Sequence, residues 1–336
     1  MTEISNRKED HIKLALQHQH QCKDGNGFDQ YQFEPNSMPE LLLDEVDCSI
    51  KFLNQKISTP LMIGAMTGGC DNAHIINQHL CEAAQACQIP MALGSQRAAL
   101  ELNLEQNIRR WIPDGIVLAN LGATQIKQQG IDLALRAVET VDANALVIHL
   151  NPLQELVQPG GDHDWRGVID AIQLCADKLP VAVIVKEVGC GIGAAATKNL
   201  MEAGIEWIEL AGRGGTNWAS IEIARNNCQT QKQIAQPFVD WGLNTAQALN
   251  MAKKSCPSMH FIGSGGIRHG LDIARCIRLG AKVTAMAQPF LEPATMSSQA
   301  VIEKIEILKQ QLRWTMFLTG SKNITDLAQA PLVTTL

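Results

Sequence analysis

The chain alternates short apolar runs with segments of helical period. Eight runs rich in apolar and β-branched residues recur along the sequence, each ending in small or polar residues. They are apolar throughout rather than alternating, which is typical of strands buried on both faces of a parallel sheet. The predicted strands cover residues 61–65, 91–95, 116–121, 145–151, 181–188, 207–211, 260–263 and 282–287.

The segments between these runs have the period of amphipathic helices. Several begin with a residue type that caps helix N-termini, namely Asp71, Asp164 and Thr245. Eight strands that alternate with helices favour a closed (β/α)₈ barrel, the TIM barrel of the α/β class, with an open doubly wound sheet as the alternative. The predicted helices cover residues 72–87, 130–141, 165–179, 193–203, 245–254 and 271–279.

Two segments fall outside this repeat. Residues 1–59 form a leader with one predicted helix over residues 6–21 and a break rich in Gly, Asn and Asp over residues 23–29. Residues 212–242 form a long insertion after the sixth strand, of the kind that serves as a lid, a binding loop or a subunit contact. We therefore expect a single barrel domain over residues 1–336, in which the leader is an N-terminal arm.

The composition of the 336-residue chain is that of a globular protein, because 46% of its residues are hydrophobic and 18% are charged. A formal net charge of −6 and the lack of a Lys/Arg-rich run argue against nucleic acid and anionic membrane surfaces as partners. Residues 1–11 are polar and no apolar run approaches the ~18 residues of a membrane span, so we expect a cytoplasmic protein. The ten cysteines include no Cys-x-x-Cys motif, which favours buried thiols over disulfides or zinc.

Two glycine-rich turns follow the sixth and seventh predicted strands. Residues 263–268 read Gly-Ser-Gly-Gly-Ile-Arg and lead into a predicted helix, and residues 212–217 read Gly-Arg-Gly-Gly-Thr-Asn. Glycines let backbone N–H groups approach an anion closely, the next helix presents its positive N-terminus, and Arg268 adds a charge. The structural alternative is a pair of tight turns with glycine caps. Because barrel enzymes frequently hold phosphate after strands seven and eight, we expect a phosphorylated cofactor here.

Polar side chains stand at the C-terminal ends of four other strands, where barrel enzymes carry their chemistry. Lys186 ends the run Val-Ala-Val-Ile-Val-Lys and is suited to form a Schiff base or to hold an anionic cofactor ring. A salt bridge with Glu187 or a neighbour is the structural alternative. The others are Thr67 after the first strand, Ser95 and Arg97 after the second, and Asn120 in the third.

The fourth strand ends in residues 149–155, His-Leu-Asn-Pro-Leu-Gln-Glu. With a strand period of two, His149 and Asn151 point the same way. The proline after them turns the chain, so Gln154 and Glu155 reach the same mouth. One carboxylate is too few for a structural metal cage, but it suits Mg²⁺, which keeps waters and takes other oxygens from a substrate phosphate. Each residue by itself also fits an ordinary loop position, so only the cluster indicates a site.

The start of the leader carries a group of cationic side chains. Arg7 and His11 stand four residues apart on the predicted leader helix, with Lys8 beside Arg7. By itself this pattern describes a solvated charged face. Next to a site that binds phosphate groups, the same pattern is also consistent with an arm that closes over an anionic substrate.

With these residues, the chain resembles the type 2 isopentenyl diphosphate isomerases, a family of flavin-dependent (β/α)₈ enzymes, along nearly its whole length. The glycine turns occur in many FMN barrels, whereas the His-x-Asn-x-x-Gln-Glu segment joined to the Arg-Lys leader is specific to this family. The matching segments are residues 7–11, 66–69, 94–97, 149–155, 186–189, 214–218 and 265–268.

The resemblance implies a set of site residues, with FMN, Mg²⁺ and a diphosphate as ligands. Glu155 is the implied Mg²⁺ ligand, and Gln154, His149, Asn151 and Lys186 are the implied catalytic residues. The residues implied to surround the substrate and its diphosphate are Arg7, Lys8, His11, Arg97, His149, Asn151 and Gln154. The residues implied to hold FMN are Ala65, Met66, Thr67, Ser95, Asn120, Lys186, Thr216, Gly265, Gly266, Arg268, Ala287 and Gln288.

The activity implied by the resemblance is the interconversion of isopentenyl and dimethylallyl diphosphate. A proton must be added to an alkene carbon and another removed from its neighbour, with no net redox change. We expect reduced FMN to stabilise the cationic species, with NADPH as its reductant, and the family implies a homo-oligomer. The chain departs from the pattern at Ala211 and Gly193, where many members have serine.

Three other functions fit part of the sequence. An FMN-dependent 2-hydroxy acid oxidase or dehydrogenase has the same barrel and phosphate turns, but it requires net hydride transfer. A lysine-based barrel aldolase uses Lys186 without flavin. A catalytically silent flavin-binding protein retains the cofactor without turnover, and the presence of Gln154, Glu155 and the Arg7-Lys8 pair argues against it.

Overall fold

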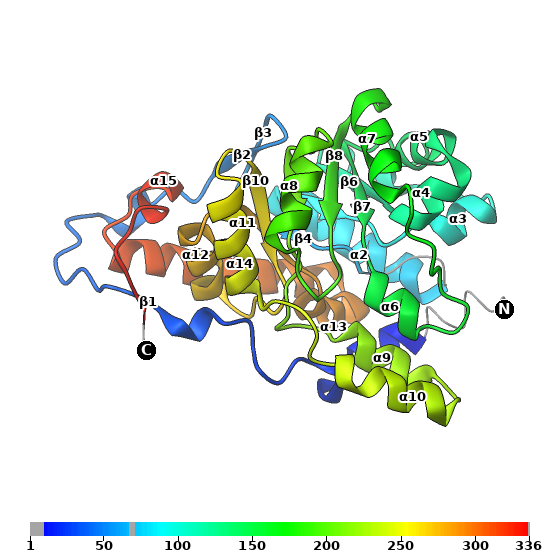
Figure 1. Cartoon of the computed structure of the whole chain (residues 1–336). Helices are drawn as coiled ribbons and strands as arrows, with labels where there is room; N and C mark the ends of the chain where they lie inside the picture. Colours follow the sequence, from blue (N-terminus) through cyan, green and yellow to red (C-terminus); the bar gives the residue numbers. More distant parts are fainter. Residues whose placement is uncertain (1–9, 67–70, 335–336) are drawn as a thin grey trace.

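The computed structural model describes residues 10–66 and 71–334, and a closed barrel of eight parallel strands lies at its centre (Figure 1). Neighbouring strands around the barrel are consecutive in the chain, and the last strand pairs with the first. This confirms the predicted (β/α)₈ barrel and excludes the open sheet. The strands are β4 (Leu61–Ile63), β5 (Met91–Ala92), β6 (Val117–Gly122), β7 (Ala145–His149), β8 (Ala182–Lys186), β9 (Trp207–Glu209), β10 (His260–Ser264) and β11 (Ala281–Met286).

Several strands are shorter than their apolar runs predict. β7 ends at His149 rather than at residue 151, and β8 ends at Lys186 rather than at residue 188. The ladder stops there, yet the residues that follow stay partly or fully buried beneath the loops at the barrel mouth. Burial extends beyond the hydrogen-bonded strand, so the apolar pattern marks buried backbone rather than strand ends.

The outer layer consists of helices, and six of them lie at or near the predicted positions. The six predicted ones are α2 (Asp71–Cys87), α5 (Ile131–Glu139), α7 (Val168–Lys178), α8 (Ala194–Glu202), α11 (Thr245–Ser255) and α12 (Gly270–Arg278). The others are α3 (Arg97–Glu101), α4 (Ala123–Gln129), α6 (Pro152–Val157), α9 (Trp218–Arg225), α10 (Gln229–Ala235), α13 (Gln288–Met296), α14 (Ser298–Leu318) and α15 (Ile324–Leu327). No helix among the described residues combines the length and the apolarity needed to cross a bilayer.

Two of the predicted helix caps are wrong. Asn244 caps α11 in a capping box with Gln247, while the Thr245 hydroxyl donates to backbone carbonyls of the 263–268 turn. Before α7 the cap position is Gly167, and Asp164 instead binds Arg166. In each case a nearby group competes for the capping side chain. α2 is described from Asp71 onward, so the residue before it lies outside the described part.

The leader contains more structure than the single predicted helix. The described part of that helix ends at residue 15 rather than 21, and short 3₁₀ turns follow. β1 (Tyr31–Phe33) pairs antiparallel with β12 (Leu332–Thr334) near the end of the chain. β2 (Ile50–Phe52) and β3 (Gln55–Ile57) form a hairpin. These strands are too short to show a period.

The β2–β3 hairpin closes the N-terminal end of the barrel. Phe52 and Ile57 are buried in one cluster with inward-facing residues of the barrel strands, such as Met62 and Ile184. The Phe52 ring meets Trp207 of β9 edge-on, with ring centroids 4.9 Å apart. Since this end is filled, a ligand can enter the barrel only at the C-terminal ends of the strands, where the predicted site lies.

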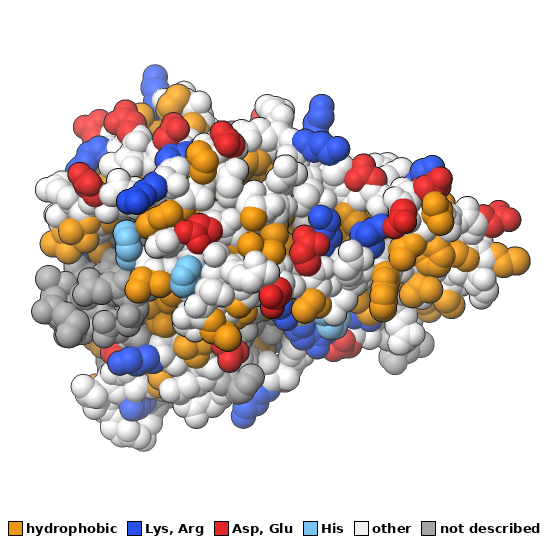
Figure 2. All heavy atoms as spheres, turned by 180° about the vertical axis from the view of Figure 1, so that it is seen from behind, with side chains coloured by type: hydrophobic (Ala, Val, Ile, Leu, Met, Phe, Trp, Pro, Cys, Tyr) orange, Lys and Arg blue, Asp and Glu red, His pale blue; other side chains and the backbone are white. Residues whose placement is uncertain are grey.

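The insertion after β9 folds into helices beside the barrel mouth. α9 packs against α6, and α10 follows it at the same end of the molecule (Figure 1). Elsewhere on the surface, Lys and Arg are interspersed with Asp and Glu on the face seen in Figure 2 and form no continuous basic field there. Apolar side chains gather at the narrow end of that face (Figure 2).

Candidate active site at the barrel mouth

Apart from His11 of the leader, the predicted site residues that the structure describes lie in the C-terminal parts of the barrel strands or on the loops and helices that follow them. Arg7, Lys8 and Thr67 lie outside the described residues. Ala65 and Met66 follow β4, and Ala287 and Gln288 follow β11, the strand that pairs with β4. These four residues therefore stand side by side at one part of the rim.

His149 is held by the neighbouring strand. Its Nδ1 lies 2.8 Å from Oδ1 of Asn120, which is 3% exposed in β6. Gln96, which the sequence did not single out, in turn accepts a hydrogen bond from the Asn120 backbone N–H at 3.0 Å. The imidazole is thus fixed at the mouth by a buried amide network, so its exposed edge has one orientation.

A single side chain fixes the two polar residues of α6. Asn151 stands at the position before the helix, and its Nδ2 donates to Oε1 of Glu155 at 2.9 Å and to Oε1 of Gln154 at 3.3 Å. Pro152 at the first helical position sets the turn that allows this contact. The predicted convergence of Asn151, Gln154 and Glu155 is therefore present in the structure.

Glu155 fits the role of one metal ligand among several, not that of a complete protein site. Its Oε2 accepts the backbone N–H of Asp162 at 2.8 Å, while Oε1 accepts from Asn151. Each oxygen keeps one lone pair, which is what a Mg²⁺ ion needs when substrate oxygens and waters supply the other positions. Within residues 10–66 and 71–334, no group of three or more His, Cys, Asp or Glu side chains is arranged so that it could hold a metal ion.

Glu222 of α9 is a central residue that the sequence analysis missed. Its side chain is fully buried, and Oε1 accepts a hydrogen bond from Nε2 of Gln154 at 3.0 Å. His11 Nε2 lies 2.9 Å from the same oxygen, and Arg225 donates to Oε2 at 2.7 Å. The available signal was a carboxylate between two isoleucines of a helical segment, which predicts a buried charge that must be paired.

The electrostatics of Glu222 favour its ionised form. Burial raises the pKa of this carboxyl group, but the hydrogen bond and charge of His11, the amide of Gln154 and the charge of Arg225 together lower it below its ordinary value. The His11 ring also meets Trp218 edge-on, with ring centroids 5.2 Å apart. Thus the described start of the leader is docked on the insertion by an ion pair and a ring contact.

Lys186 lies inside the barrel beside two carboxylates. It is 7% exposed, and its Nζ donates to the backbone carbonyl of Glu187 at 2.5 Å, so the contact is not the salt bridge considered above. Glu209 of β9 is its register neighbour. Oε1 of Glu209 accepts from Ser264 at 2.8 Å, whereas buried Oε2 has no hydrogen-bond partner in the described chain. This part of the barrel therefore retains unsatisfied polar groups for a ligand.

Glu187 holds the loop after β8. Its Oε2 accepts the backbone N–H groups of residues 188, 189 and 190 at 2.6, 2.5 and 2.5 Å. Burial raises the pKa of Glu187 to about 7, although these donors and Lys186 oppose the shift. The loop that it holds lines a pocket at the mouth.

The two glycine turns pack backbone against backbone. Gly265 and Gly266 have φ values of +103° and +69°, and residues with a side chain rarely adopt this backbone conformation. A Cβ on Gly265 would lie 2.0 Å from the Gly212 carbonyl oxygen, and one on Gly266 would lie 2.2 Å from Gly214. In the described part of the chain, the backbone N–H groups of Gly265 and Gly266 meet no acceptor. The 263–268 turn thus fits a phosphate group.

Arg268 does not present a free charge at this turn. Its guanidinium binds the buried Asp272 at 3.0 Å and the exposed Asp29 of the leader at 3.0 Å. Both carboxylates raise the pKa of Arg268. An anion bound here therefore depends on backbone donors more than the sequence suggested.

Three further predicted residues make no hydrogen bond to the His149, Glu155, Glu222 or Arg268 side chains in the described part of the chain. Arg97 starts α3 and pairs with Glu101 at 2.9 Å, with its side chain 40% exposed. Ser95 is half-buried just before that helix. Thr216 contacts Gln21 of the leader, with 3.5 Å between Oγ1 and the Gln21 amide group.

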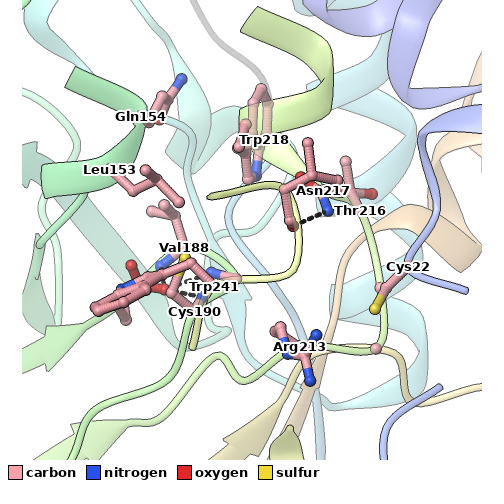
Figure 3. A pocket seen from close by; sticks show the side chains of 16 residues that line it. Cys22, Leu153, Gln154, Val188, Cys190, Arg213, Thr216, Asn217, Trp218 and Trp241 are labelled. Atoms are coloured by element: carbon pink, nitrogen blue, oxygen red, sulfur yellow. Dashed lines mark hydrogen bonds between the residues drawn. The ribbon is translucent and has the colours of Figure 1, made fainter. Parts of the chain in front are cut away.

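A pocket connects these elements (Figure 3). Gln154 of α6, residues 187–190 after β8 and the 212–217 turn line it together with Trp218 and Trp241 of the insertion. Figure 3 shows these side chains around one opening, with Cys22 of the leader at its edge. The pocket therefore joins the segment that carries Gln154 to one of the turns predicted to hold a phosphorylated cofactor.

Comparison with known proteins first defines the class. A family model described as FMN-dependent dehydrogenase matches residues 158–334. Solved structures with the same fold include a (S)-mandelate dehydrogenase, with a TM-score of 0.68 and 18% identity over 97% of this chain and 99% of that chain. A putative lactate oxidase of Pediococcus acidilactici has a TM-score of 0.69 and 14% identity over 100% of this chain and 88% of that chain. The fold and the family match are those of the FMN-dependent barrel enzymes.

Sequence relatives narrow the class further. The isopentenyl-diphosphate delta-isomerase of Stutzerimonas stutzeri is 46% identical over 98% of this chain and 97% of its own length. The isomerase of the same name from Cronobacter sakazakii is 45% identical over 98% and 97%, and that from Halobacterium salinarum is 42% identical over 99% and 94%. The chain belongs to the isopentenyl-diphosphate delta-isomerase family.

Proposed function

We propose that this enzyme interconverts isopentenyl diphosphate and dimethylallyl diphosphate with reduced FMN and Mg²⁺. The observation that carries the proposal is the fixed position of the Gln154 amide, which Asn151 holds on one side and Glu222 on the other. Family membership supports the same activity. When bound, reduced FMN supplies an electron-rich ring that stabilises a cationic species and exchanges protons near it.

The chain's own residues bind and orient the reactants. Gln154 orients the alkene end of the substrate, while His149 and Asn151 complete the wall beside it. Lys186 places a positive charge next to the anionic reduced ring. The residues that hold FMN are Ala65, Met66, Thr67, Ser95, Asn120, Lys186, Thr216, Gly265, Gly266, Arg268, Ala287 and Gln288.

The diphosphate is held by cations and by the metal. Glu155 would hold Mg²⁺ through its carboxylate, and the ion would supply positive charge for the diphosphate, with substrate oxygens and waters as its other ligands. Arg7, Lys8, His11 and Arg97 supply positive charge from the leader and from α3. NADPH is the proposed reductant of the flavin, and it would not be consumed in each turnover. The enzyme acts in the cytoplasm as a homo-oligomer, with the 212–242 insertion as a candidate subunit contact.

The proposal is tested on the purified protein with its own flavin. The visible spectrum is recorded, and isopentenyl diphosphate is then assayed anaerobically with Mg²⁺ before and after the flavin is reduced. We expect dimethylallyl diphosphate only with reduced flavin and without stoichiometric loss of reductant. Flavin reduction by a 2-hydroxy acid substrate would instead establish an oxidase or dehydrogenase. A colourless protein whose Lys186 is trapped by borohydride and substrate would establish an aldolase, and bound flavin without turnover would indicate a silent binder.

A further inference from the structure

A leader residue outside the barrel reaches the 263–268 turn. Asn26 is 1% exposed, and its Nδ2 donates to the carbonyl oxygen of Gly266 at 2.5 Å and to Oδ2 of Asp272 at 3.2 Å. Its Oδ1 accepts the backbone N–H of Phe28 at 3.0 Å. All hydrogen-bonding capacity of this amide except one acceptor lone pair is therefore used inside the protein.

The contact with Gly266 sets the direction of a backbone donor. The peptide group between Gly266 and Ile267 is planar and trans, so its N–H points away from its carbonyl oxygen. Asn26 holds that carbonyl, and the N–H of Ile267 then faces the opposite side. No described residue accepts this N–H. It is thus available to an anion, together with the N–H groups of Gly265 and Gly266.

The second contact links Asn26 to a buried carboxylate. Asp272 is fully buried at the start of α12, and its Oδ2 accepts both the backbone N–H of Arg268 at 3.2 Å and the guanidinium Nε at 3.0 Å. Arg275 donates to the other oxygen at 3.2 Å. Asp272 therefore anchors the end of the turn to α12, and Asn26 joins the middle of the turn, at Gly266, to the same anchor.

Asn26 is also wedged against the 212–217 turn. A Cβ on Gly214 would lie 2.5 Å from Cα of Asn26, so the leader backbone touches that turn. The carbonyl of Asn26 accepts the N–H of Ala246 at 3.1 Å, at the start of α11. Both glycine turns are thus held in place by one residue of a segment that precedes the barrel.

We propose that Asn26 is a positioning residue for the phosphate of the flavin, acting through the 263–268 turn. The proposal rests on the proposed function, because it takes FMN as the ligand of that turn. Asn26 does not touch the ligand; it fixes the peptide groups that do. The flavin ring itself is held by other elements, so the effect of Asn26 is confined to the phosphate.

The test compares FMN with riboflavin, which has the same ring and lacks the phosphate. Both are titrated against apo-protein by fluorescence quenching, for the unaltered protein and for Asn26→Leu, which removes the amide at similar volume. We expect FMN affinity to fall about tenfold while riboflavin affinity changes less than about twofold. Asn250→Leu is the matched control, because it removes another barrel-to-leader hydrogen bond, to Tyr31, at an exposed position. Its FMN preference is expected to be unchanged.

Riboflavin binding shows whether the first variant is folded, and a second variant changes the polarity of the contact instead of its size. Asn26→Asp keeps the shape and the acceptor for Phe28, but it turns an oxygen toward the Gly266 carbonyl and Asp272. We expect the same loss of FMN preference and a shifted ³¹P resonance of bound FMN. Equal loss of FMN and riboflavin affinity, or no loss, overturns the positioning role while leaving the proposed function intact. If the unaltered protein shows no preference for FMN over riboflavin, the phosphate site and the role of Asn26 are both overturned.

Discussion

The side-chain amide of Gln154 donates a hydrogen bond of 3.0 Å to Oε1 of Glu222, and this contact joins two distant parts of the chain. Gln154 follows β7, whereas Glu222 lies in the insertion after β9. The same carboxylate oxygen contacts His11 of the leader at 2.9 Å. The residue proposed to orient the substrate is therefore held by the insertion, whose carboxylate is in turn held by the leader.

We predict that Gln154→Leu retains FMN and loses most isomerase turnover, about a hundredfold in kcat, because leucine fills the space but cannot hydrogen-bond to Glu222. The measurements are flavin absorbance per protein and the rate of dimethylallyl diphosphate formation. Leu156→Ala, an exposed position on the same helix, is the control. Full activity of the Gln154 variant, or purification without flavin, would contradict the assigned role.

For the metal we predict that Glu155→Gln raises the Mg²⁺ concentration needed for half-maximal rate by about tenfold or more. The amide keeps an oxygen for Asn151 but loses the negative charge that attracts the cation. Glu155→Ala is expected to act in the same way, with an added cost in stability, because it removes the acceptors of both Asn151 and the Asp162 N–H, whereas Glu155→Gln keeps one of them. Rates are measured across Mg²⁺ and substrate concentrations. An unchanged dependence on both would remove Glu155 from the metal site.

A pH dependence of stability follows from Glu187. Burial raises its pKa from 4.5 to about 7, so the folded protein binds a proton that the unfolded chain releases between these values. The stabilising contribution of this group is complete below about pH 4.5 and is lost as the pH rises to about 7. Relative to Glu187→Gln, the free energy of unfolding should fall by about 3 kcal/mol over this window. Urea unfolding at pH 4 to 8 measures it, and parallel profiles would argue against the shift.

The tight packing of the 263–268 turn predicts that alanine substitutions at two glycines differ greatly in their effect on stability and FMN binding. In Gly266→Ala the new Cβ would lie 2.2 Å from the Gly214 backbone at a φ of +69°, and we expect a loss of about 3 kcal/mol in stability together with loss of FMN. Gly25→Ala has a φ of +68° but no atom within 4 Å, so about 1 kcal/mol is expected, with FMN retained. Thermal unfolding measures the stability of both variants, and flavin absorbance measures their FMN content. Similar losses in the two would show that the turns are not packed as described.

The barrel and much of the site could be predicted because their signals are local. Apolar runs at regular spacing indicated buried parallel strands. The polar residues directly after each run were therefore predicted to lie at the barrel mouth. The segment 149–155 likewise carries its own geometry, since a strand, a proline and one helical turn bring Asn151 next to Glu155. Such patterns lie within a few residues, where backbone geometry alone fixes which side chains meet.

Other contacts were decided by the tertiary structure alone. Asn26 and Gly266 are 240 positions apart in the chain, and His11 and Glu222 are 211 apart. No period or spacing in the sequence relates such residues. The sequence by itself determined the order of the barrel strands, the glycine turns and which polar residues stand near the strand ends. Only closure of the barrel, which presses the leader and the insertion against its mouth, decided which polar groups become buried and must find partners there.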